Sequence, residues 1–384
     1  MGKGAYIGVE GVARKVKKIY VGIDGVARRI KKAYIGIGGV ARPCFVGSDL
    51  DYYGTTEKPL NGARYGLVAT TIANHALFSG GYQSYQSGGV ASSKWVGNVD
   101  AYDTSLTQKD LTPMYSNVYG CKATTVGNYA LFCGGFANKS YAYDASLTQK
   151  DTVQSLREER GWCSAATTVG NHALFGGVSV VDAYDTSLTR KDTVQSLREE
   201  RGYFAATTVG NHALFGGGSL DLHSDYRDTV DAYDVSLTRK DTVQSLRVAR
   251  SDIAATTVGN HALFGGGMHF YVGDFGNSHN QPTTSVDAYD TSLTRKNVTS
   301  LGGYSAGDIA ATTVGNYALF SGDGSLMKTY AYDTSLTQKV LSKRIYRNQL
   351  AATTVGNYAL FGGGMSTTTL DASNLVDVFE FNKE

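Results

Sequence analysis

Histidine and aspartate, which often serve acid–base catalysis and metal binding, recur at fixed places in this sequence. Four of the seven histidines stand between an asparagine and Ala-Leu-Phe: His75, His172, His212 and His261. Tyrosine takes the same place at Tyr129, Tyr317 and Tyr358. A position that accepts either ring favours a packing role over metal binding. An aspartate closes the repeated tripeptide Ala-Tyr-Asp at Asp103, Asp144, Asp185, Asp234, Asp290 and Asp333. Because Ser or Thr follows it closely, we expect a turn residue in each copy.

The other residues with chemical potential form no recurrent constellation. His223, His269 and His279 lie in variable segments without a second ligand at a repeated spacing. The Gly-Gly-Gly runs lack the Lys-Ser/Thr and the helix of a phosphate-binding loop. Four cysteines without a C-x-x-C pair indicate buried thiols, not a zinc site or a disulfide framework. We therefore expect no catalytic residue, no metal and no cofactor.

These residues belong to a repeat, Ala-Thr-Thr-Val-Gly-Asn-His-Ala-Leu-Phe-Gly-Gly in its clearest form. Seven copies begin at Ala69, Ala123, Ala166, Ala206, Ala255, Ala311 and Ala352. A unit of roughly 40 residues with Gly-Gly after a β-run indicates a propeller blade. In the fourth copy we expect four strands, named a to d, over residues 205–209, 212–215, 229–233 and 239–246. Two domains follow: residues 1–47, and an all-β seven-bladed propeller over residues 48–384.

The two ends of the propeller predict how the ring closes. The seventh copy reaches its third strand, residues 375–381, and the sequence then ends. Residues 52–60 precede the first copy and resemble a fourth strand. We expect them to complete blade seven, because a closed ring has no free sheet edge.

The blades resemble the kelch-type repeat, in which Gly-Gly precedes a strand that ends in Tyr-Asp. The tryptophan usual near the start of strand d is replaced here by Leu-Thr-Arg/Gln-Lys. The resemblance implies a kelch-like propeller. Galactose-oxidase-type enzymes share this ring and use a copper site of Tyr, His and Cys. Since no such set stands out here, a carbohydrate-active enzyme is the less favoured alternative.

Residues 1–47 contain a second, basic repeat. Tyr6, Tyr20 and Tyr34 are 14 residues apart, and an acidic residue with Gly between β-formers predicts tight hairpins. Residues 1–43 carry ten Lys/Arg and two acidic residues, a charge of +8, whereas the rest carries 26 and 32, a charge of −6. We expect an attachment arm rather than a nucleic-acid-binding segment. Its candidate contact residues are Tyr6, Tyr20, Tyr34, Arg14, Arg28 and Arg42.

The wording of this arm, Ala-Tyr-Ile-Gly-Val-Glu-Gly-Val-Ala-Arg in tandem and closing with Gly-Val-Ala-Arg-Pro, resembles amino-terminal segments of virion structural proteins. These come from phages and prophages of Gram-positive bacteria and are typically tail, baseplate or fibre components. The resemblance covers about 43 residues. It implies contacts with other virion proteins and an oligomer in the particle.

The blades differ chiefly in one set of connections. The b–c loops change completely from blade to blade, over residues 82–98, 136–140, 178–180, 219–228, 268–285, 324–328 and 365–374. In a four-stranded meander the b–c and d–a connections share one face. Diverse loops on a constant scaffold are where binding is usually built. Aromatic and polar residues there suit a glycan or a protein epitope. The candidate ligand-binding residues are Tyr82, Tyr85, Trp95, Arg160, Arg201, Tyr226, Arg250, His269, Tyr271 and Phe275.

No run approaches the ~18 apolar residues of a membrane span, and the first residues lack a signal-peptide core. We therefore expect a protein made in a bacterial cytoplasm and carried in a virion. The predicted function is a non-enzymatic virion protein that binds a host surface glycan or protein. The alternative is a decoration or assembly protein without a receptor role.

Overall fold

The computed structural model describes residues 6–9, 12–15, 19–23, 26–30, 32–37, 40–46, 49–87, 90–115, 120–135, 138–150, 153–159, 165–221, 224–272, 278–303, 307–322, 328–343 and 345–382. Before residue 49, and over residues 84–87 and 90–93, only the backbone is described. The chain divides into two compact units, Met1–Asp51 with Glu380–Glu384, and Tyr52–Phe379.

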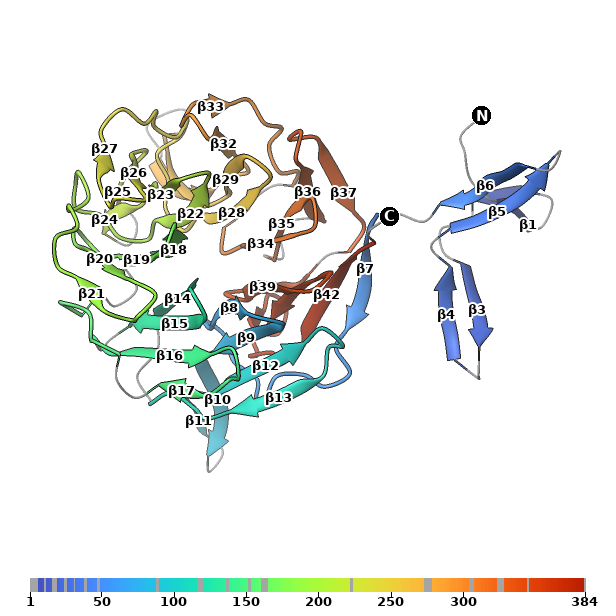
Figure 1. Cartoon of the computed structure of the whole chain (residues 1–384), viewed down its shortest axis with the longest axis horizontal. Helices are drawn as coiled ribbons and strands as arrows, with labels where there is room; N and C mark the ends of the chain where they lie inside the picture. The colour runs from blue at the N-terminus through green and yellow to red at the C-terminus, as the bar shows by residue number, and fades with distance from the viewer. Residues whose placement is uncertain are drawn as a thin grey trace. The chain divides into compact units, whose positions relative to one another are not determined.

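The larger unit is a seven-bladed β-propeller (Figure 1). Each blade is a four-stranded antiparallel sheet, and strand a lies nearest the central axis. The a strands are β8 (Val68–Ile72), β14 (Cys121–Val126), β18 (Ala165–Val169), β22 (Ala205–Val209), β28 (Ala254–Val258), β34 (Ala310–Val314) and β39 (Ala351–Val355). The b strands are β9 (His75–Ser79), β15 (Tyr129–Gly134), β19 (His172–Gly176), β23 (His212–Gly216), β29 (His261–Gly265), β35 (Tyr317–Ser321) and β40 (Tyr358–Gly362).

The outer strands complete the blades. The c strands are β12 (Val99–Asp103), β16 (Ser140–Asp144), β20 (Val181–Tyr184), β26 (Val230–Asp234), β32 (Val286–Asp290), β36 (Thr329–Asp333) and β42 (Val376–Phe381). The d strands are β13 (Gln108–Leu111), β17 (Gln149–Lys150), β21 (Arg190–Lys191), β27 (Arg239–Lys240), β33 (Arg295–Lys296), β37 (Gln338–Leu341) and, in blade seven, β7 (Leu50–Thr55).

The ring closes as the sequence predicts. Blade seven has the strand order β39-β40-β42-β7, so a strand from before the first blade completes the last. The backbone amide of Thr56 continues this pairing with a hydrogen bond to the carbonyl of Val376 at 3.0 Å.

Adjacent blades are packed through a small residue at the end of strand b. A Cβ on Gly216 would come within 2.9 Å of the Phe264 ring in the next blade. The same relation joins blade seven to blade one, where a Cβ on Gly362 would meet Phe78 at 2.7 Å. Serine or cysteine takes this place in three blades, and Cys133 is buried there as expected. Close packing between blades therefore requires a small residue at this point.

The expected length of strand d is wrong in blade four. We expected residues 239–246, but β27 ends at Lys240. The apolar residues that follow, Val243 and Leu246, are three apart instead of alternating. Both are buried in the cluster between blades four and five, with Val209 and Ile253. Burial between the blades thus replaces continued strand pairing.

Further hairpins lie outside the blade sheets. Those on the propeller are β10 (Tyr82–Ser87) with β11 (Val90–Trp95), β24 (Ser219–Asp221) with β25 (Ser224–Tyr226), β30 (Met268–Val272) with β31 (Ser278–Pro282), and the pair β38 (Arg347–Asn348) and β41 (Met365–Ser366). The smaller unit contains β1 (Tyr6–Val9) paired with β2 (Val12–Lys15), β3 (Ile19–Ile23) with β4 (Val26–Ile30), and β5 (Lys32–Ile37) with β6 (Val40–Val46). Within the ranges given above, no helix has the length and apolarity needed to cross a membrane.

Candidate binding face

The described parts of the b–c and d–a connections form one end of the ring, which we call the variable face. Eleven large apolar or aromatic side chains are exposed among the described residues. Eight of them belong to this face: Tyr115, Val178, Leu220, Phe270, Tyr271, Tyr346, Leu370 and Leu375. The other three, Tyr53, Val235 and Val340, lie in outer strands or a c–d turn. Exposed apolar surface is therefore concentrated where the blades differ.

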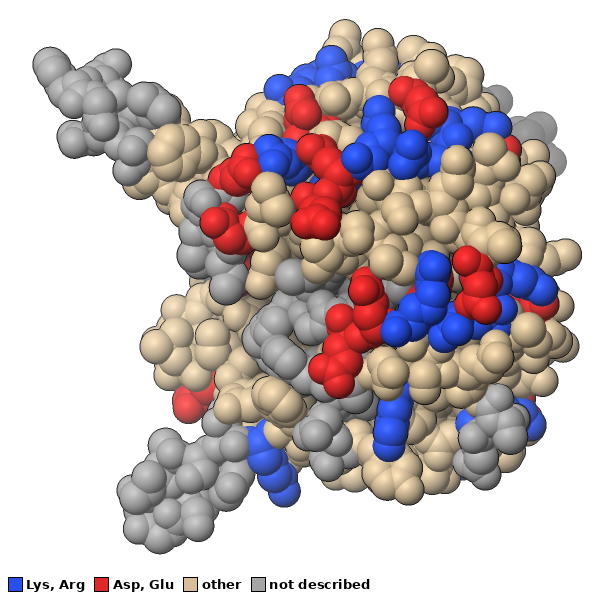
Figure 2. Space-filling view, turned by 90° about the vertical axis from the view of Figure 1, so that its left-hand side faces the viewer, with Lys and Arg blue, Asp and Glu red and all other residues tan. Residues whose placement is uncertain are grey.

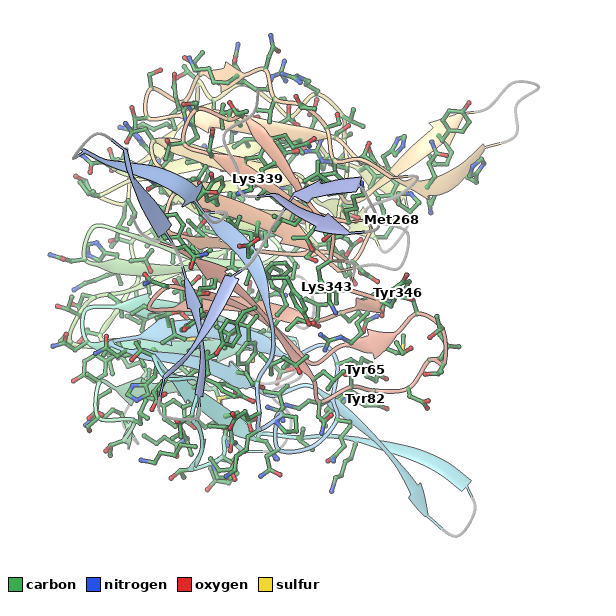
Figure 3. All side chains as sticks on the ribbon, turned by 90° about the vertical axis from the view of Figure 1, so that its right-hand side faces the viewer. Tyr65, Tyr82, Met268, Lys339, Lys343 and Tyr346 are labelled. Carbon is green, nitrogen blue, oxygen red and sulfur yellow. The ribbon has the colours of Figure 1, made fainter. Side chains whose placement is uncertain are left out.

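The hairpin β30–β31 presents an aromatic and polar surface. Figure 3 shows it projecting from the same side of the ring as β10–β11. Tyr271, 41% exposed, stands opposite His279 in the pairing, and their ring centroids are 5.5 Å apart. On the same side of the hairpin, the amide nitrogen of Gln281 lies 3.3 Å from Nε2 of His269. Burial lowers the pKa of His269, which leaves this imidazole neutral at pH 7. Neutral rings beside amide and imidazole groups suit stacking and hydrogen bonding to a sugar.

The hairpin β10–β11 begins on an aromatic pair. Tyr82 packs edge to face on Tyr65, with ring centroids 5.4 Å apart, and Trp95 stands opposite Tyr82 in the hairpin. Tyr82 and Trp95 are both half-buried. They therefore support the base of this hairpin, whereas Lys94 beside them is exposed.

Each projecting hairpin rests on a backbone bridge between a b–c and a d–a loop. Tyr65 pairs with Tyr82, Gly202 with Ser219, and Ser251 with Met268. In blade seven, Asn348 pairs with Met365. A glycine before each b–c residue permits this approach: a Cβ on Gly81, Gly218, Gly267 or Gly364 would lie 2.3–2.7 Å from the bridging carbonyl oxygen. The Gly-Gly-Gly runs thus allow the backbones of the b–c and d–a loops to pair at the base of a hairpin.

Two arginines expected to contact a ligand are buried instead. Arg201 and Arg250 are fully buried, and their guanidinium groups pair with Asp231 at 2.7 Å and Asp287 at 3.0 Å. Both also donate to a strand-b carbonyl, Arg201 to that of Phe215. Each arginine directly precedes a bridge residue. It therefore positions a hairpin base and cannot reach a ligand on the surface.

The arginine–aspartate pair follows a rule that is visible within the chain. Five blades carry aspartate at the second place of the Val-Asp-Ala-Tyr-Asp segment or its variants, at Asp100, Asp182, Asp231, Asp287 and Asp377. Four of these carboxylates pair with the arginine at one equivalent place, Arg64, Arg201, Arg250 and Arg347. Asp182 pairs with Arg157, which is the equivalent of Arg198 in the next blade. Blades two and six carry Tyr141 and Tyr330 there, with Val118 and Ala306 in the arginine's place. This correlation could have identified the arginines as structural from sequence.

The remaining candidates are only partly placed. Tyr226 ends β25 and is half-buried, and burial raises the pKa of its hydroxyl. Tyr85 lies in β10, opposite Ser92, but its side chain is outside the described residues, as are Arg160 and Phe275.

In the arm, the pairing register places each tyrosine and each arginine at equivalent points of its hairpin. Tyr6, Tyr20 and Tyr34 stand opposite Lys15, Arg29 and Pro43, while Arg14, Arg28 and Arg42 stand opposite Ile7, Val21 and Ile35. The three hairpins thus repeat one arrangement of the candidate residues.

Sequence reasoning missed several exposed residues of the variable face. Tyr115, 72% exposed, lies in a d–a loop, with the Lys139 ammonium 4.6 Å from its ring centroid. Tyr346 and Leu370 are exposed in blade seven. Their position in the sequence could have identified them, because all lie in the loops that differ between blades.

The recurrent aspartates are turn residues. Oδ1 of Asp103 accepts hydrogen bonds from the backbone amides of Ser105 at 2.8 Å and Thr107 at 3.0 Å, and the other five c–d turns repeat this pattern. A hydrogen bond from Lys150 holds the pKa of Asp144 well below its usual range. The recurrent histidines are half-buried beside these turns. Among the residues described, no three His, Cys, Asp or Glu side chains group to hold a metal ion.

The outer edges of the blades carry charges of both signs. Lys191 pairs with Asp185 at 2.6 Å, and Lys240 and Lys296 pair likewise with Asp234 and Asp290. Figure 2 shows basic and acidic residues interleaved over this edge. Neighbouring charges of opposite sign thus offset one another along this edge.

No protein-family model matches the chain, and no curated protein shows significant similarity to it.

Proposed function

We propose that the chain is a non-enzymatic structural protein of a phage or phage-derived particle, with a kelch-like propeller. Its arm binds other virion proteins, and its variable face binds a glycan or protein on a bacterial surface. The observation that carries the binding role is the concentration of exposed aromatic and apolar side chains on the variable face. The virion assignment rests on the tandem arm motif alone.

The hairpin β30–β31 is the best single contact region. Tyr271 is exposed and packs at a tilt against the ring of His279, which stands opposite it in the hairpin register. Phe270 projects from the other side of the same strand and is 50% exposed. Together they offer two aromatic surfaces with little packing role in the ring.

Multivalent display tests this function. The full chain is biotinylated at an added terminal tag, assembled on streptavidin, and incubated with Gram-positive cells and with their purified cell-wall glycan. We expect binding that Phe270→Ala with Tyr271→Ala weakens at least tenfold, while the Tm stays within about 2 °C, because exposed residues contribute little to stability.

The matched control is Val235→Ala, which removes an exposed apolar side chain from a c–d turn on the opposite end of the ring. It should leave binding unchanged. Absence of binding across a panel of hosts at this valency would favour the decoration or assembly role. Turnover of the glycan would favour the carbohydrate-active enzyme.

A further inference from the structure

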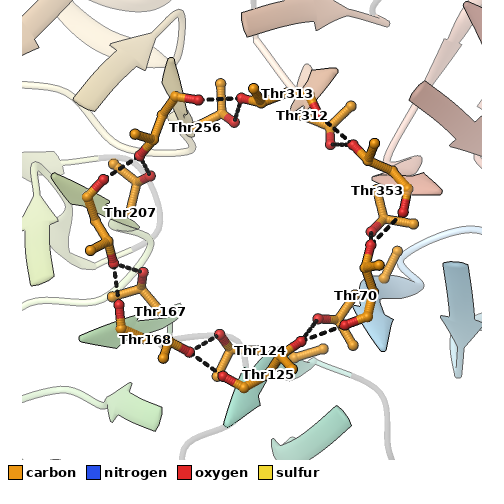
Figure 4. Close-up of a pocket in the computed structure, with 16 residues that line it drawn as sticks. Thr70, Thr124, Thr125, Thr167, Thr168, Thr207, Thr256, Thr312, Thr313 and Thr353 are labelled. Atoms are coloured by element: carbon orange, nitrogen blue, oxygen red, sulfur yellow. Dashed lines mark hydrogen bonds between the residues drawn. The ribbon is translucent and has the colours of Figure 1, made fainter. Parts of the chain in front are cut away.

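The axis of the propeller is a channel lined by threonine (Figure 4). Its cavity of about 580 Å³ is bounded by Ala69, Ala123 and seven consecutive threonine pairs. We call the members of each pair the first and second threonine: 70/71, 124/125, 167/168, 207/208, 256/257, 312/313 and 353/354. No charged side chain lines this cavity in the part of the chain that the structure describes.

Two hydrogen bonds per blade join these threonines into a closed belt. The hydroxyl of each second threonine bonds to the backbone carbonyl of the second threonine in the preceding blade, all seven times. The hydroxyl of each first threonine lies 2.7–3.1 Å from the hydroxyl of the second threonine in the following blade, again seven times.

This pattern of contacts determines which hydroxyl donates its proton in each hydrogen bond of the belt. A carbonyl oxygen has no proton, so each second threonine must donate to it. A hydroxyl has one proton, so the second threonine can only accept from the first threonine, which must donate. All fourteen hydroxyl protons are therefore used within the belt. The hydroxyls can therefore offer only lone pairs to a ligand in the channel, two from each first threonine and one from each second threonine. In six of the seven blades the second threonine is the less buried of the two.

A ring of hydroxyl acceptors selects a ligand whose surface consists of donors. A hydrated metal cation is such a ligand, because its bound waters turn their oxygens to the metal and their protons outward. Mg²⁺ loses its waters reluctantly, so it suits a site that offers no carboxylate. Six waters at about 30 Å³ each need roughly 180 Å³, which the cavity accommodates.

We propose that the threonine belt binds a fully hydrated divalent cation of the Mg²⁺ type through the water shell of the ion. The threonine hydroxyls accept hydrogen bonds from the bound waters through the lone pairs that the belt leaves unused, and the hydrogen bonds of the belt fix the orientation of these hydroxyls. This site is independent of the variable face and of the virion role proposed above.

Hexamminecobalt(III) tests the proposal directly. Its ammine ligands do not exchange, and they present only N–H donors of about the same reach as hydrated Mg²⁺. Crystals of the full chain soaked in this ion at 150 mM NaCl should show a cobalt anomalous peak on the propeller axis at the level of the belt. In solution, Mg²⁺ should raise the Tm saturably by about 1–3 °C at ten times Kd.

Two variants distinguish binding by the hydroxyl acceptors from binding that depends only on the shape of the channel. Thr207→Val, Thr256→Val and Thr312→Val together remove three acceptors at nearly constant volume, and should abolish the axial peak and the Mg²⁺-dependent Tm rise. Serine at the same three places keeps the hydroxyls and should retain both. Absence of cobalt from the axis of the unmodified protein, or an equal Tm rise in the valine variant, would overturn the proposal. The crystal result needs no variant to fold.

Discussion

A leucine holds a backbone conformation that usually favours glycine in each of the six c–d turns. Leu106, Leu147, Leu188, Leu237, Leu293 and Leu336 have φ between +62° and +66°. The conformation is unfavourable for a residue of this size. Leu237 and Leu293 nevertheless pack against the buried clusters beside their blades. Apolar burial between blades therefore offsets local strain at these positions.

The a–b turn of blade one contains a residue whose replacement should stabilise the protein. Ala73 has φ +48°, where the equivalent glycines of other blades have φ +53° to +55°. Ala73→Gly should raise the free energy of unfolding by about 0.5–1 kcal/mol, because glycine adopts this conformation without a Cβ clash. Denaturant unfolding of the purified chain measures the change.

The reverse substitution in another blade is the matched control. A Cβ on Gly210 would lie 3.0 Å from Thr291, so Gly210→Ala should destabilise the protein. In blade two, which faces Ala73, the turn residue equivalent to Thr291 is the smaller Ala145. An unchanged or lower unfolding midpoint for Ala73→Gly would contradict the assignment of strain.

At the scale of elements, a buried ion pair fixes the base of each projecting hairpin. Arg250→Met should cost about 3–5 kcal/mol of stability, because it leaves the buried carboxylate of Asp287 without its closest cation. Lys296→Met removes a partly exposed pair with Asp290 and should cost less than about 1 kcal/mol. Chemical denaturation of both variants measures the two losses in the free energy of unfolding. Equal, small losses would show that Arg250 has no such role.

The ring could be predicted from the sequence because the repeat presents most of its elements in several copies that can be compared. Strands a, b and c, the turn aspartates and the closure by β7 all followed from copies compared within one chain. The length of strand d could not be predicted from the sequence. Val243 and Leu246 are residue types that favour strands, but here they are buried between blades instead of pairing in a sheet. Arg201 and Arg250 were misassigned because a charged residue in a loop normally faces water. The threonine belt was also missed, since its hydroxyl network exists only when all seven blades meet.

At the scale of the whole molecule, stability depends on the outer strand that joins the two ends of the ring. Removing residues 1–55 would delete β7 and leave β42 with a free edge. We expect this truncation to lower the Tm by at least 5 °C, because blade seven loses a quarter of its strands and the ring its closure.

Removal of residues 1–47 is the control, because it deletes the arm hairpins and keeps β7. It should leave the Tm of the propeller within about 2 °C of the intact chain. Thermal melts of both truncations that match the intact chain would refute a closing role for β7.

The common base under the hairpins has a genetic consequence. Residues 150–161 and 191–202 are identical, as are residues 167–177 and 207–217, so identical segments of the chain flank unlike b–c loops. Where the coding sequences of these segments are also alike, homologous recombination can transfer a loop from one blade, or from a related gene, to another without altering the ring that receives it. Such an exchange would change the variable face of the protein in one step, while the fold is inherited unchanged.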